Sequence, residues 1–398
     1  MISPLRWHPL FHAFIRRLYF DRVRVAGNGH LNLAGPVLAL CLHRNGAVDG
    51  FVYRQALPSV QYMVKAGLRK SLMGRLFFDG LEVTRKEDGG RDGNLEAIAE
   101  CLDFISGGGC LGVFPEGSSG LGPRHLPFKS GAARIALRHH EEGKPLTVLA
   151  LGIHYERAWA FRSRVEVVIG QTIELDLPET LSSSGARLQE IKRRMAFALE
   201  SVGTNFPDAA TQDLAQKLAY IATLGTGLCY FDVLKSMEHR LPDEATKALL
   251  ELEANACGNR LLRHQGVPLF PLRWPWAYVF ATLLVAPFVL TGFLINLPPV
   301  IIADWAGRRF SDDTNVIALW RILTGVPLLV LWAIAVCVLG LAAGPWWSPL
   351  LYLILTWLAV HGWYRLKKLA VVAWNGAFHP SFRPMALAVR HAVLASLP

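Results

Sequence analysis

Short apolar runs alternate with longer helical stretches through the first half of the chain. The run Val37–Leu42, VLALCL, has the length and continuous apolar character of a buried strand. Strands that alternate with helices are typical of an α/β domain with a mainly parallel sheet flanked by helices. We therefore predict this fold class, with strands at Val23–Ala26, Val37–Leu42, Gln61–Val64, Leu81–Thr84, Cys110–Phe114, Thr147–Ile153 and Val165–Ile169, and with helices after Asp49 and at Gly67–Phe77, Leu95–Ser106 and Ser130–Arg138.

The second half of the chain is helical and becomes strongly apolar. A helix with apolar residues from Leu188 to Leu199 is predicted first, followed by a polar helical region at 204–270. Three apolar segments then follow at 274–302, 320–343 and 346–364, each bounded by Trp, Tyr or Arg. They are long enough to enter a bilayer, and a buried core helix does not explain runs of this length.

The first apolar segment is expected to be broken. It contains Pro287, Gly292, Asn296, Pro298 and Pro299, which suit a re-entrant or interfacial hairpin better than a straight span. A hairpin would place Arg308 and Arg309 on the same side as the cluster Arg365–Lys368, in agreement with the positive-inside rule. The prediction is therefore two full spans, one broken segment in the near leaflet, and cytoplasmic basic residues.

The N-terminal twenty residues predict an amphipathic helix, because the apolar residues recur at a helical spacing with Arg16 and Arg17 between them: Leu5, Leu10, Phe11, Phe14 and Leu18. Such a helix either lies on a membrane surface or covers the edge of the neighbouring domain. The predicted organisation is an N-terminal helix at 1–20, an α/β domain at 21–203, a helical accessory region at 204–270, and a membrane region with a C-terminal tail at 271–398.

Composition supports a folded domain joined to a membrane part. Of the 398 residues 52% are hydrophobic, the formal net charge is +10, and the mean hydropathy is +0.29. A positive charge favours anionic lipid or an anionic donor such as coenzyme A as partner. Nucleic acid is not expected, because the basic residues are scattered among apolar spans. The six cysteines show no C-x-x-C spacing and predict reduced core residues, not metal ligands or disulfides.

The candidate chemistry begins at Ala39–Gly50, where an apolar run ends in His43 and, six residues on, Asp49. An imidazole can take a proton from a hydroxyl, and a carboxylate can fix its tautomer and stabilise the imidazolium that forms. This pair is the base and orienting group of a Ser-His-Asp system without its serine, so the nucleophile would be a substrate hydroxyl.

A second motif makes the first one specific. Gly107–Gly109 leads into CLGVF, then into Pro115–Ser119 and the stretch PFKSGAARIAL at Pro127–Leu137. In this order the two motifs resemble the glycerolipid acyltransferase family, which includes 1-acylglycerol-3-phosphate and glycerol-3-phosphate O-acyltransferases. The resemblance covers roughly residues 20 to 180 in four blocks: GPVLALCLHRN, GLEVTR, FPEG with KSGAAR, and LTVLALGIHY.

Three departures from the family pattern bear on the acceptor. The spacing is His-x5-Asp where His-x4-Asp is usual, and Gly46 is suited to absorb the extra residue because it adopts backbone angles closed to other residues. The arginine that often follows FPEG is replaced by Ser118 and Ser119, and the proline of the fourth block is absent.

The resemblance implies roles for the remaining site residues. His43 would be the catalytic base and Asp49 its partner. Backbone N–H groups around Glu116–Ser118 would face the oxyanion, or Glu116 would hold the acceptor by its hydroxyls. The cations would meet a phosphate, and the implied substrate-binding set is Arg85, Glu116, Gly117, Ser118, Lys129 and Arg134, with Arg44 next in line.

The implied function is an O-acyltransferase of phospholipid biosynthesis or remodelling. It would move a fatty acyl group from acyl-CoA or acyl-carrier protein to a lysophospholipid or glycerol 3-phosphate, without a metal or a further cofactor. Membrane lipids would be partners, and the enzyme would be an integral membrane protein with its catalytic domain facing the cytoplasm. Two alternatives stay open: an acyltransferase for a non-phosphorylated acceptor, and a non-catalytic lipid-binding membrane protein on the same fold.

Overall fold

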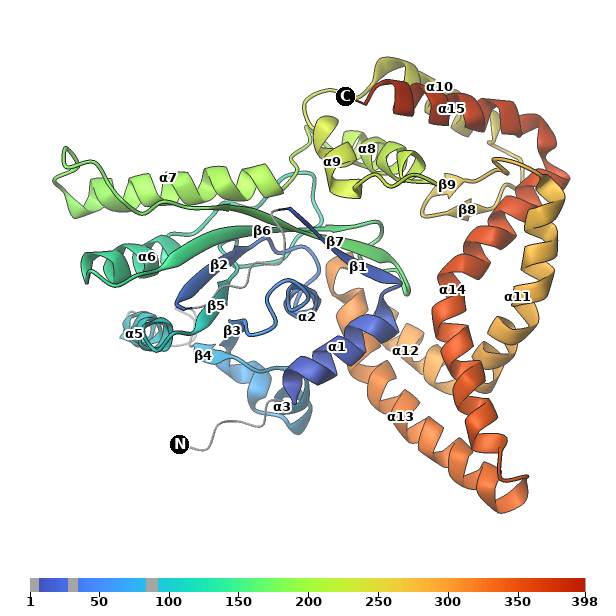
Figure 1. The fold of residues 1–398 in the computed structure, drawn as a ribbon, viewed down its shortest axis with the longest axis horizontal. Coiled ribbons are helices and arrows are strands. Elements are labelled where there is room, and N and C mark those ends of the chain that lie inside the picture. Colours follow the sequence, from blue (N-terminus) through green and yellow to red (C-terminus); the bar gives the residue numbers. More distant parts are fainter. Residues whose placement is uncertain (1–6, 28–34, 84–91, 398) are drawn as a thin grey trace. The chain divides into compact units, whose positions relative to one another are not determined.

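The computed structural model describes residues 7–27, 35–83 and 92–397 (Figure 1). The chain forms two compact units. The sheet unit comprises residues 1–17, 23–154 and 165–205, and the helical unit comprises residues 18–22, 155–164 and 206–398. Two short segments from the first half of the chain therefore pack with the C-terminal half.

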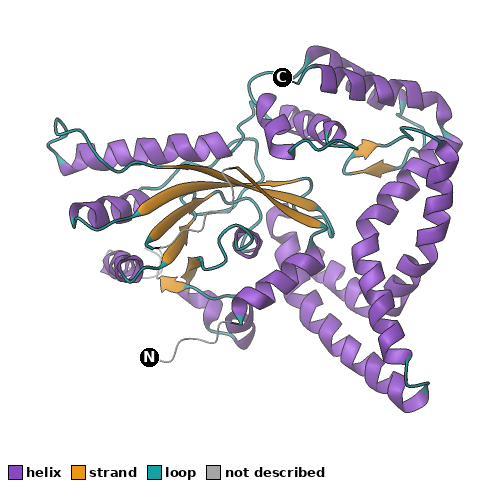
Figure 2. Cartoon of the chain, viewed as in Figure 1, coloured by secondary structure: helices purple, strands orange, loops and turns teal. Residues whose placement is uncertain are grey.

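A seven-stranded sheet with the order β1-β7-β6-β2-β5-β3-β4 forms the centre of the sheet unit (Figures 1 and 2). Strand β2 runs parallel to both of its neighbours, with Leu38 opposite Leu111 of β5 and Val148 of β6. All seven predicted strands and the mainly parallel α/β fold are confirmed. Their bounds are β1 Arg22–Gly27, β2 Val37–Cys41, β3 Gln61–Lys65, β4 Leu81–Val83, β5 Cys110–Val113, β6 Thr147–Tyr155 and β7 Arg164–Thr172.

Helices lie on both faces of the sheet, α5, α6 and α7 on one and α1 and α2 on the other (Figure 1). Every residue of β2 and β5 is buried, which explains why these strands are continuously apolar instead of alternating. The helices of this unit are α1 His8–Tyr19, α2 Val48–Tyr53, α3 Leu72–Phe77, α5 Asp92–Ser106, α6 Gly131–Glu141 and α7 Ser184–Val202, with a 3₁₀ turn at Ala66–Arg69.

The helix predicted at 67–77 forms as two pieces. Ser71 has extended backbone angles, and its side chain accepts a hydrogen bond from Gly74 N. A serine in this conformation starts a new helix by satisfying one of the free N–H groups of its first turn. The 3₁₀ turn before Ser71 and α3 after it are therefore separate elements.

Helix α1 docks on the sheet unit. His12 Nε2 bonds to the Phe77 carbonyl at 2.8 Å, and the His12 ring lies 4.5 Å from that of Phe51. On the outer face Leu10 and Phe14 remain exposed. Helix α1 thus covers one face of the domain and presents apolar side chains outward.

The helical unit contains a small hydrophobic core and a set of long apolar helices. Its elements are α8 Ala209–Ala222, α9 Tyr230–Ser236, α10 Asp243–Asn255, the hairpin β8 Arg263–His264 and β9 Val267–Pro268, α11 Pro275–Ile295, α12 Leu297–Arg309, α13 Ile317–Ala343, α14 Ser348–Phe378 and α15 Arg383–Ala395. Leu218, Leu249 and Val389 are fully buried together. The last helix of the chain therefore packs into the same core as α8 and α10.

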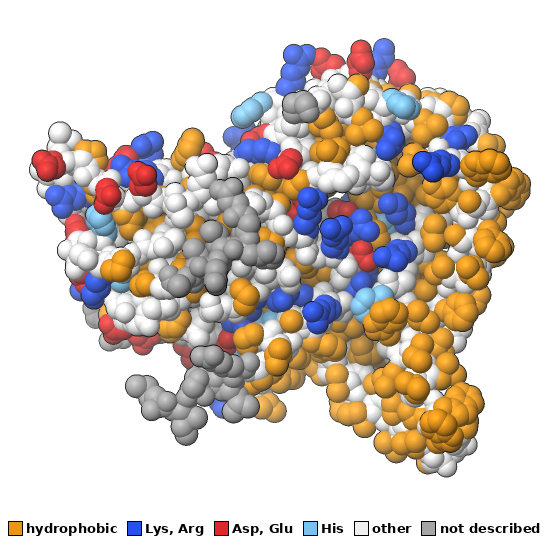
Figure 3. Space-filling model, viewed as in Figure 1, with side chains coloured by type: hydrophobic (Ala, Val, Ile, Leu, Met, Phe, Trp, Pro, Cys, Tyr) orange, Lys and Arg blue, Asp and Glu red, His pale blue; other side chains and the backbone are white. Residues whose placement is uncertain are grey.

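Two helical stretches of the described chain are long and apolar enough to cross a membrane, 275–295 and 314–343. Only 11% of each apolar window is buried, whereas the core helix of a globular domain would be mostly buried. Figure 3 shows hydrophobic side chains gathered over the surface of these helices. The third predicted segment, 346–364, forms the first part of α14, which continues to Phe378.

The predicted break in the first apolar segment lies at Asn296, between α11 and α12. Its side-chain amide donates to Gly292 O at 2.8 Å and to Thr356 Oγ1 at 2.9 Å. Its carbonyl oxygen accepts from Tyr352 at 2.7 Å. These bonds satisfy a buried amide at a turn between helices. Pro287, which was expected to contribute to the break, lies inside α11.

Candidate active site

The candidate site lies at the carboxyl end of the central strand β2. His43 follows β2, and Asp49 lies in the first turn of α2. His43 Nδ1 and Asp49 Oδ2 are 2.9 Å apart. The aspartate side chain is completely buried, whereas the histidine side chain is 16% exposed. The structure therefore brings the predicted pair together, with the imidazole at the surface and its partner behind it.

The loop between the two residues is built around the carboxylate. Asp49 Oδ2 also accepts the backbone N–H groups of Arg44 at 2.6 Å and Asn45 at 2.8 Å. Gly46 has a φ of +55°, in the left-handed region that glycine adopts without a Cβ penalty. The extra residue of the His-x5-Asp spacing is thus taken up at Gly46 without separating the pair, as the sequence predicted.

The Asp49 carboxylate favours one tautomer of His43. The carboxylate accepts, so Nδ1 carries the hydrogen and Nε2 keeps its lone pair. Among the residues that the structure describes, none bonds to His43 Nε2. That lone pair is the proton acceptor which the proposed chemistry needs.

Glu116 links the FPEG turn to the start of the histidine loop. Its Oε2 accepts from His43 N at 2.6 Å, and its Oε1 accepts from Leu126 N at 3.1 Å. The residue is 3% exposed. Burial raises the pKa of this carboxyl group, and the two N–H donors oppose the rise. Both oxygens are used within the chain, which gives Glu116 a positioning role and leaves the contact with acceptor hydroxyls a prediction.

Two aromatic residues that sequence reasoning did not single out support the imidazole. The ring of Phe114 stacks on His43 with centroids 4.2 Å apart and an interplanar angle of 24°. The ring of Tyr62 stacks in turn on Phe114, with centroids 5.4 Å apart. Phe114 precedes Pro115 in the quoted motif, so its position was available as a signal, whereas Tyr62 lies on β3 and carries no local signature.

The substrate-binding candidates fall into two groups. Gly117 has a φ of +72°, and a Cβ placed there would lie 2.4 Å from Lys129 Nζ. The Lys129 ammonium therefore lies directly beside the FPEG turn. The backbone N–H of Lys129 donates to Pro115 O at 2.8 Å. Ser118 is exposed next to them. The structure brings these three residues together.

The other basic candidates are not all placed at this site. Arg134 is exposed on α6, and Arg85 lies outside the described residues. Arg44 is buried, and its Nη2 donates to Gly122 O at 2.9 Å. Burial lowers its pKa, while the nearby Glu116 and Asp49 carboxylates raise it. Arg44 therefore balances two buried carboxylates instead of facing solvent.

No group of three His, Cys, Asp or Glu residues with metal-site geometry occurs in the described part of the chain.

Residues 22–153 match the family model whose description is Acyltransferase. This segment is an acyltransferase domain. The domain contains β1 to β6 with His43, Asp49 and Glu116, so the family resemblance inferred from the motifs is confirmed.

One curated relative is glycerol-3-phosphate O-acyltransferase 2 of Saccharomyces cerevisiae, which is 32% identical over 123 residues. That match covers 30% of this chain and 17% of the yeast protein. Among solved structures, the 1-acyl-sn-glycerophosphate (LPA) acyltransferase PlsC from Thermotoga maritima matches with 16% identity and a TM-score of 0.35. That match covers 51% of this chain and 84% of PlsC.

Proposed function

We propose that this protein transfers a fatty acyl group from acyl-CoA or acyl-carrier protein to a hydroxyl of a glycerolipid acceptor. The observation that carries the proposal is the His43–Asp49 pair, with Nδ1 held at 2.9 Å and Nε2 open, inside an acyltransferase domain. The acceptor class follows from the likeness to the yeast glycerol-3-phosphate acyltransferase.

In the proposed reaction, His43 Nε2 removes the proton of the acceptor hydroxyl as its oxygen attacks the thioester carbonyl. The tetrahedral intermediate collapses with loss of the thiolate, which takes up the proton held by His43. Asp49 stabilises the imidazolium between these two steps. The products are an ester and a free thiol, and the histidine returns to its starting state.

The backbone around the FPEG turn is proposed to bind the developing oxyanion. Gly117 N already donates to Phe114 O at 3.0 Å. The N–H of the neighbouring Ser118, an exposed residue, would donate to a substrate oxygen. Lys129 is beside it, and together with Arg85 and Arg134 it would bind the phosphate of a lysophospholipid or of glycerol 3-phosphate.

We also propose that the protein is integral to a membrane and that its catalytic domain faces the cytoplasm. Two mostly exposed apolar helices support membrane insertion. The cytoplasmic side is proposed because the basic residues Arg308, Arg309, Arg365 and Lys368 follow or interrupt the apolar segments.

Thiol release by the purified full chain tests the proposal. Acyl-CoA is supplied with glycerol 3-phosphate, lysophosphatidate, monoacylglycerol or a long-chain amine, and wild type is compared with His43→Ala. Loss of the general base should lower turnover roughly 10²–10⁴-fold. His239→Ala, at an exposed histidine of the helical unit, is the matched control and should match wild type.

The acceptor panel separates the alternatives. Turnover confined to monoacylglycerol or the amine would replace the phosphorylated acceptor with a non-phosphorylated one. Equal, slow thiol release by wild type and His43→Ala with every acceptor, together with lipid that co-purifies, would favour a non-catalytic lipid-binding protein.

A further inference from the structure

The helical unit holds a large apolar cavity apart from the residues of the candidate active site. Its volume is about 770 Å³, within the range of roughly 300–1,000 Å³ found for ligand pockets. Helices α11 to α14 form most of the wall, with Phe293, Ile322 and Val326 among the apolar side chains. Trp159 and Phe161, from the connection between β6 and β7, complete it.

Four charged residues line the same cavity, and their charges do not balance. Asp304 accepts from Arg321 Nη2 at 2.5 Å through Oδ1 and from Arg308 Nε at 2.8 Å through Oδ2. Lys367 lies over the Trp363 ring, with Nζ 5.6 Å from its centroid, and pairs with no carboxylate of the described residues. The cavity lining thus carries three cations and one carboxylate, which leaves an excess of two positive charges.

Arg321 is held in place by several groups of the helical unit. Its Nη1 donates to Trp159 O at 2.6 Å, so two of its nitrogens are fixed by the protein. Its Nε is buried beside Gly307, and the guanidinium also interacts with the Tyr19 side chain. The protein therefore holds the Arg321 charge in place at the cavity wall, where an anionic ligand would balance the excess positive charge.

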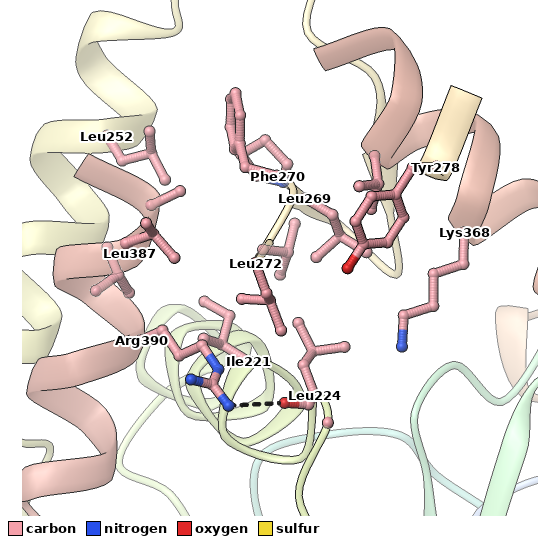
Figure 4. Close-up of a pocket in the computed structure, with 16 residues that line it drawn as sticks. Ile221, Leu224, Leu252, Leu269, Phe270, Leu272, Tyr278, Lys368, Leu387 and Arg390 are labelled. Carbon is pink, nitrogen blue, oxygen red and sulfur yellow. Dashed lines mark hydrogen bonds between the residues drawn. The ribbon is translucent and has the colours of Figure 1, made fainter. Parts of the chain in front are cut away.

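A smaller cavity of this unit does not share these features. It lies among α8, α14 and α15, has a volume of about 230 Å³, and is lined by leucines such as Leu252 and Leu269 (Figure 4). Its Arg390 donates to the Leu224 carbonyl at 3.1 Å. A cavity below the usual ligand range is better explained as imperfect packing between helices.

We propose that the large cavity binds a phospholipid whose headgroup is a phosphate monoester. The phosphate would accept hydrogen bonds from Arg321 and Lys367, and the acyl chains would lie against Phe293 and Val326. The apolar wall and the exposed apolar helices α11 and α13 argue for a ligand with chains over a soluble phosphate compound. Binding of this lipid requires no acyl transfer.

Native mass spectrometry of the full chain in a neutral detergent, titrated with dioleoyl phosphatidate or dioleoyl phosphatidylcholine, tests the proposal. Phosphatidate should bind more tightly, and Arg321→Gln and Lys367→Gln should each weaken it about tenfold or more, as expected for loss of a charge-assisted bond. Lys247→Gln, at an exposed lysine of α10 that makes one long ion pair, removes the same charge and should leave binding unchanged. His43→Ala should also bind normally, which separates this site from the proposed function.

The apolar part of the site is tested by filling it. Leu329 lines the cavity, so Leu329→Trp should abolish phosphatidate binding, whereas Leu283→Trp, on the exposed face of α11, should not. Melting temperatures of all variants establish that they fold. Equal binding of both lipids, or binding unaffected by the Arg321 and Lys367 variants, would mean only bulk lipid and overturn the proposal. Displacement by millimolar inorganic phosphate alone, or by palmitoyl-CoA at lower concentration than phosphatidate, would overturn it in favour of a soluble phosphate or the acyl donor.

Discussion

At the scale of single residues, Asp49 is the group on which the candidate site depends. One of its oxygens accepts the His43 ring and the N–H groups of Arg44 and Asn45. It therefore both shapes the loop and sets the histidine tautomer. We expect the two functions to be separable, because the loop needs an acceptor oxygen whereas the imidazolium needs a negative charge.

Asp49→Asn should preserve folding and lower turnover by roughly 10²–10⁴-fold. An amide oxygen can still accept the loop N–H groups, but the amide cannot stabilise the imidazolium and allows the wrong tautomer. Thiol release at saturating substrate measures the loss, and Asp312→Asn, at an exposed aspartate, controls for the loss of a carboxylate. Near-normal turnover of Asp49→Asn would show that another group orients His43.

Glu116 offers a prediction in pH. Burial raises the pKa of the Glu116 carboxyl group in the folded state. The native state therefore holds the carboxyl proton more tightly than the unfolded state does. As a result, the stability of the fold decreases as the pH rises from about 4.5, the ordinary pKa, through the raised pKa. Glu116→Gln removes this titration, but its amide nitrogen cannot accept the second backbone N–H, which costs about 1–3 kcal/mol. The melting temperature of the variant should lie below that of wild type, with the largest gap at low pH and a smaller one at pH 8.

Melting curves from pH 4 to pH 8 check this sign. A gap that widens with rising pH would mean that the N–H groups of His43 and Leu126 outweigh the cost of burial. Glu244→Gln, in the exposed first turn of α10, is the control. The gap between its melting temperature and that of wild type should not vary with pH in this way.

At the scale of elements, the loop from His43 to the start of α2 joins a buried strand to a short buried helix. Gly46 sits at its bend with a φ of +55°. The Asp49 N–H donates to Gly46 O at 3.2 Å, so a change of backbone at Gly46 shifts the first turn of α2 and the carboxylate that it carries.

Gly46→Ala should therefore destabilise the fold by about 1–2 kcal/mol, the cost of a Cβ in left-handed backbone. The substitution should lower kcat and have a smaller effect on KM. The position of the base changes, while the groups proposed to bind substrate do not. Gly185→Ala, at a helical glycine with open space around it, is the matched control and should leave both constants unchanged. A fall in stability with an unchanged kcat would show that the loop relaxes without moving Asp49.

At the scale of the whole molecule, the C-terminal helices bear on membrane topology. Arg308, at the end of α12, and Lys367, in α14, line the same cavity. Ser348 begins α14 after the short connection from α13. If α11 and α12 form a re-entrant hairpin, we expect Arg308 and Lys367 on the cytoplasmic side of a membrane and Ser348 on the other.

Labelling with an impermeant thiol reagent in intact cells tests this topology. In a background without the six native cysteines, single cysteines in place of Arg309 and Lys368 should be protected, and one in place of Ser348 should react. Permeabilised cells are the control, in which Arg309→Cys should become reactive. Labelling of Arg309→Cys in intact cells would contradict a re-entrant hairpin of α11 and α12.

The local elements were predictable because their causes are local. The strand at Val37–Leu42 is apolar at every position, as a strand buried on both faces must be, and β2 forms there. The histidine and aspartate could be paired from sequence because six residues and one glycine are enough to close the turn. The break at Asn296 was expected for the same reason, from a cluster of residues that disfavour a straight helix.

The tertiary structure alone decided which residues share a surface. Tyr62 lies on β3 and Phe114 directly follows β5, and the parallel pairing of β3, β5 and β2 brings both rings to His43. Glu116 was predicted at the site, but its two backbone donors come from positions 73 residues before it and 10 after it. The cavity at Arg321 depends on helices separated along the chain and on the connection at Trp159. A sequence determines the conformations that each segment favours, whereas contacts between distant segments depend on how the whole chain packs.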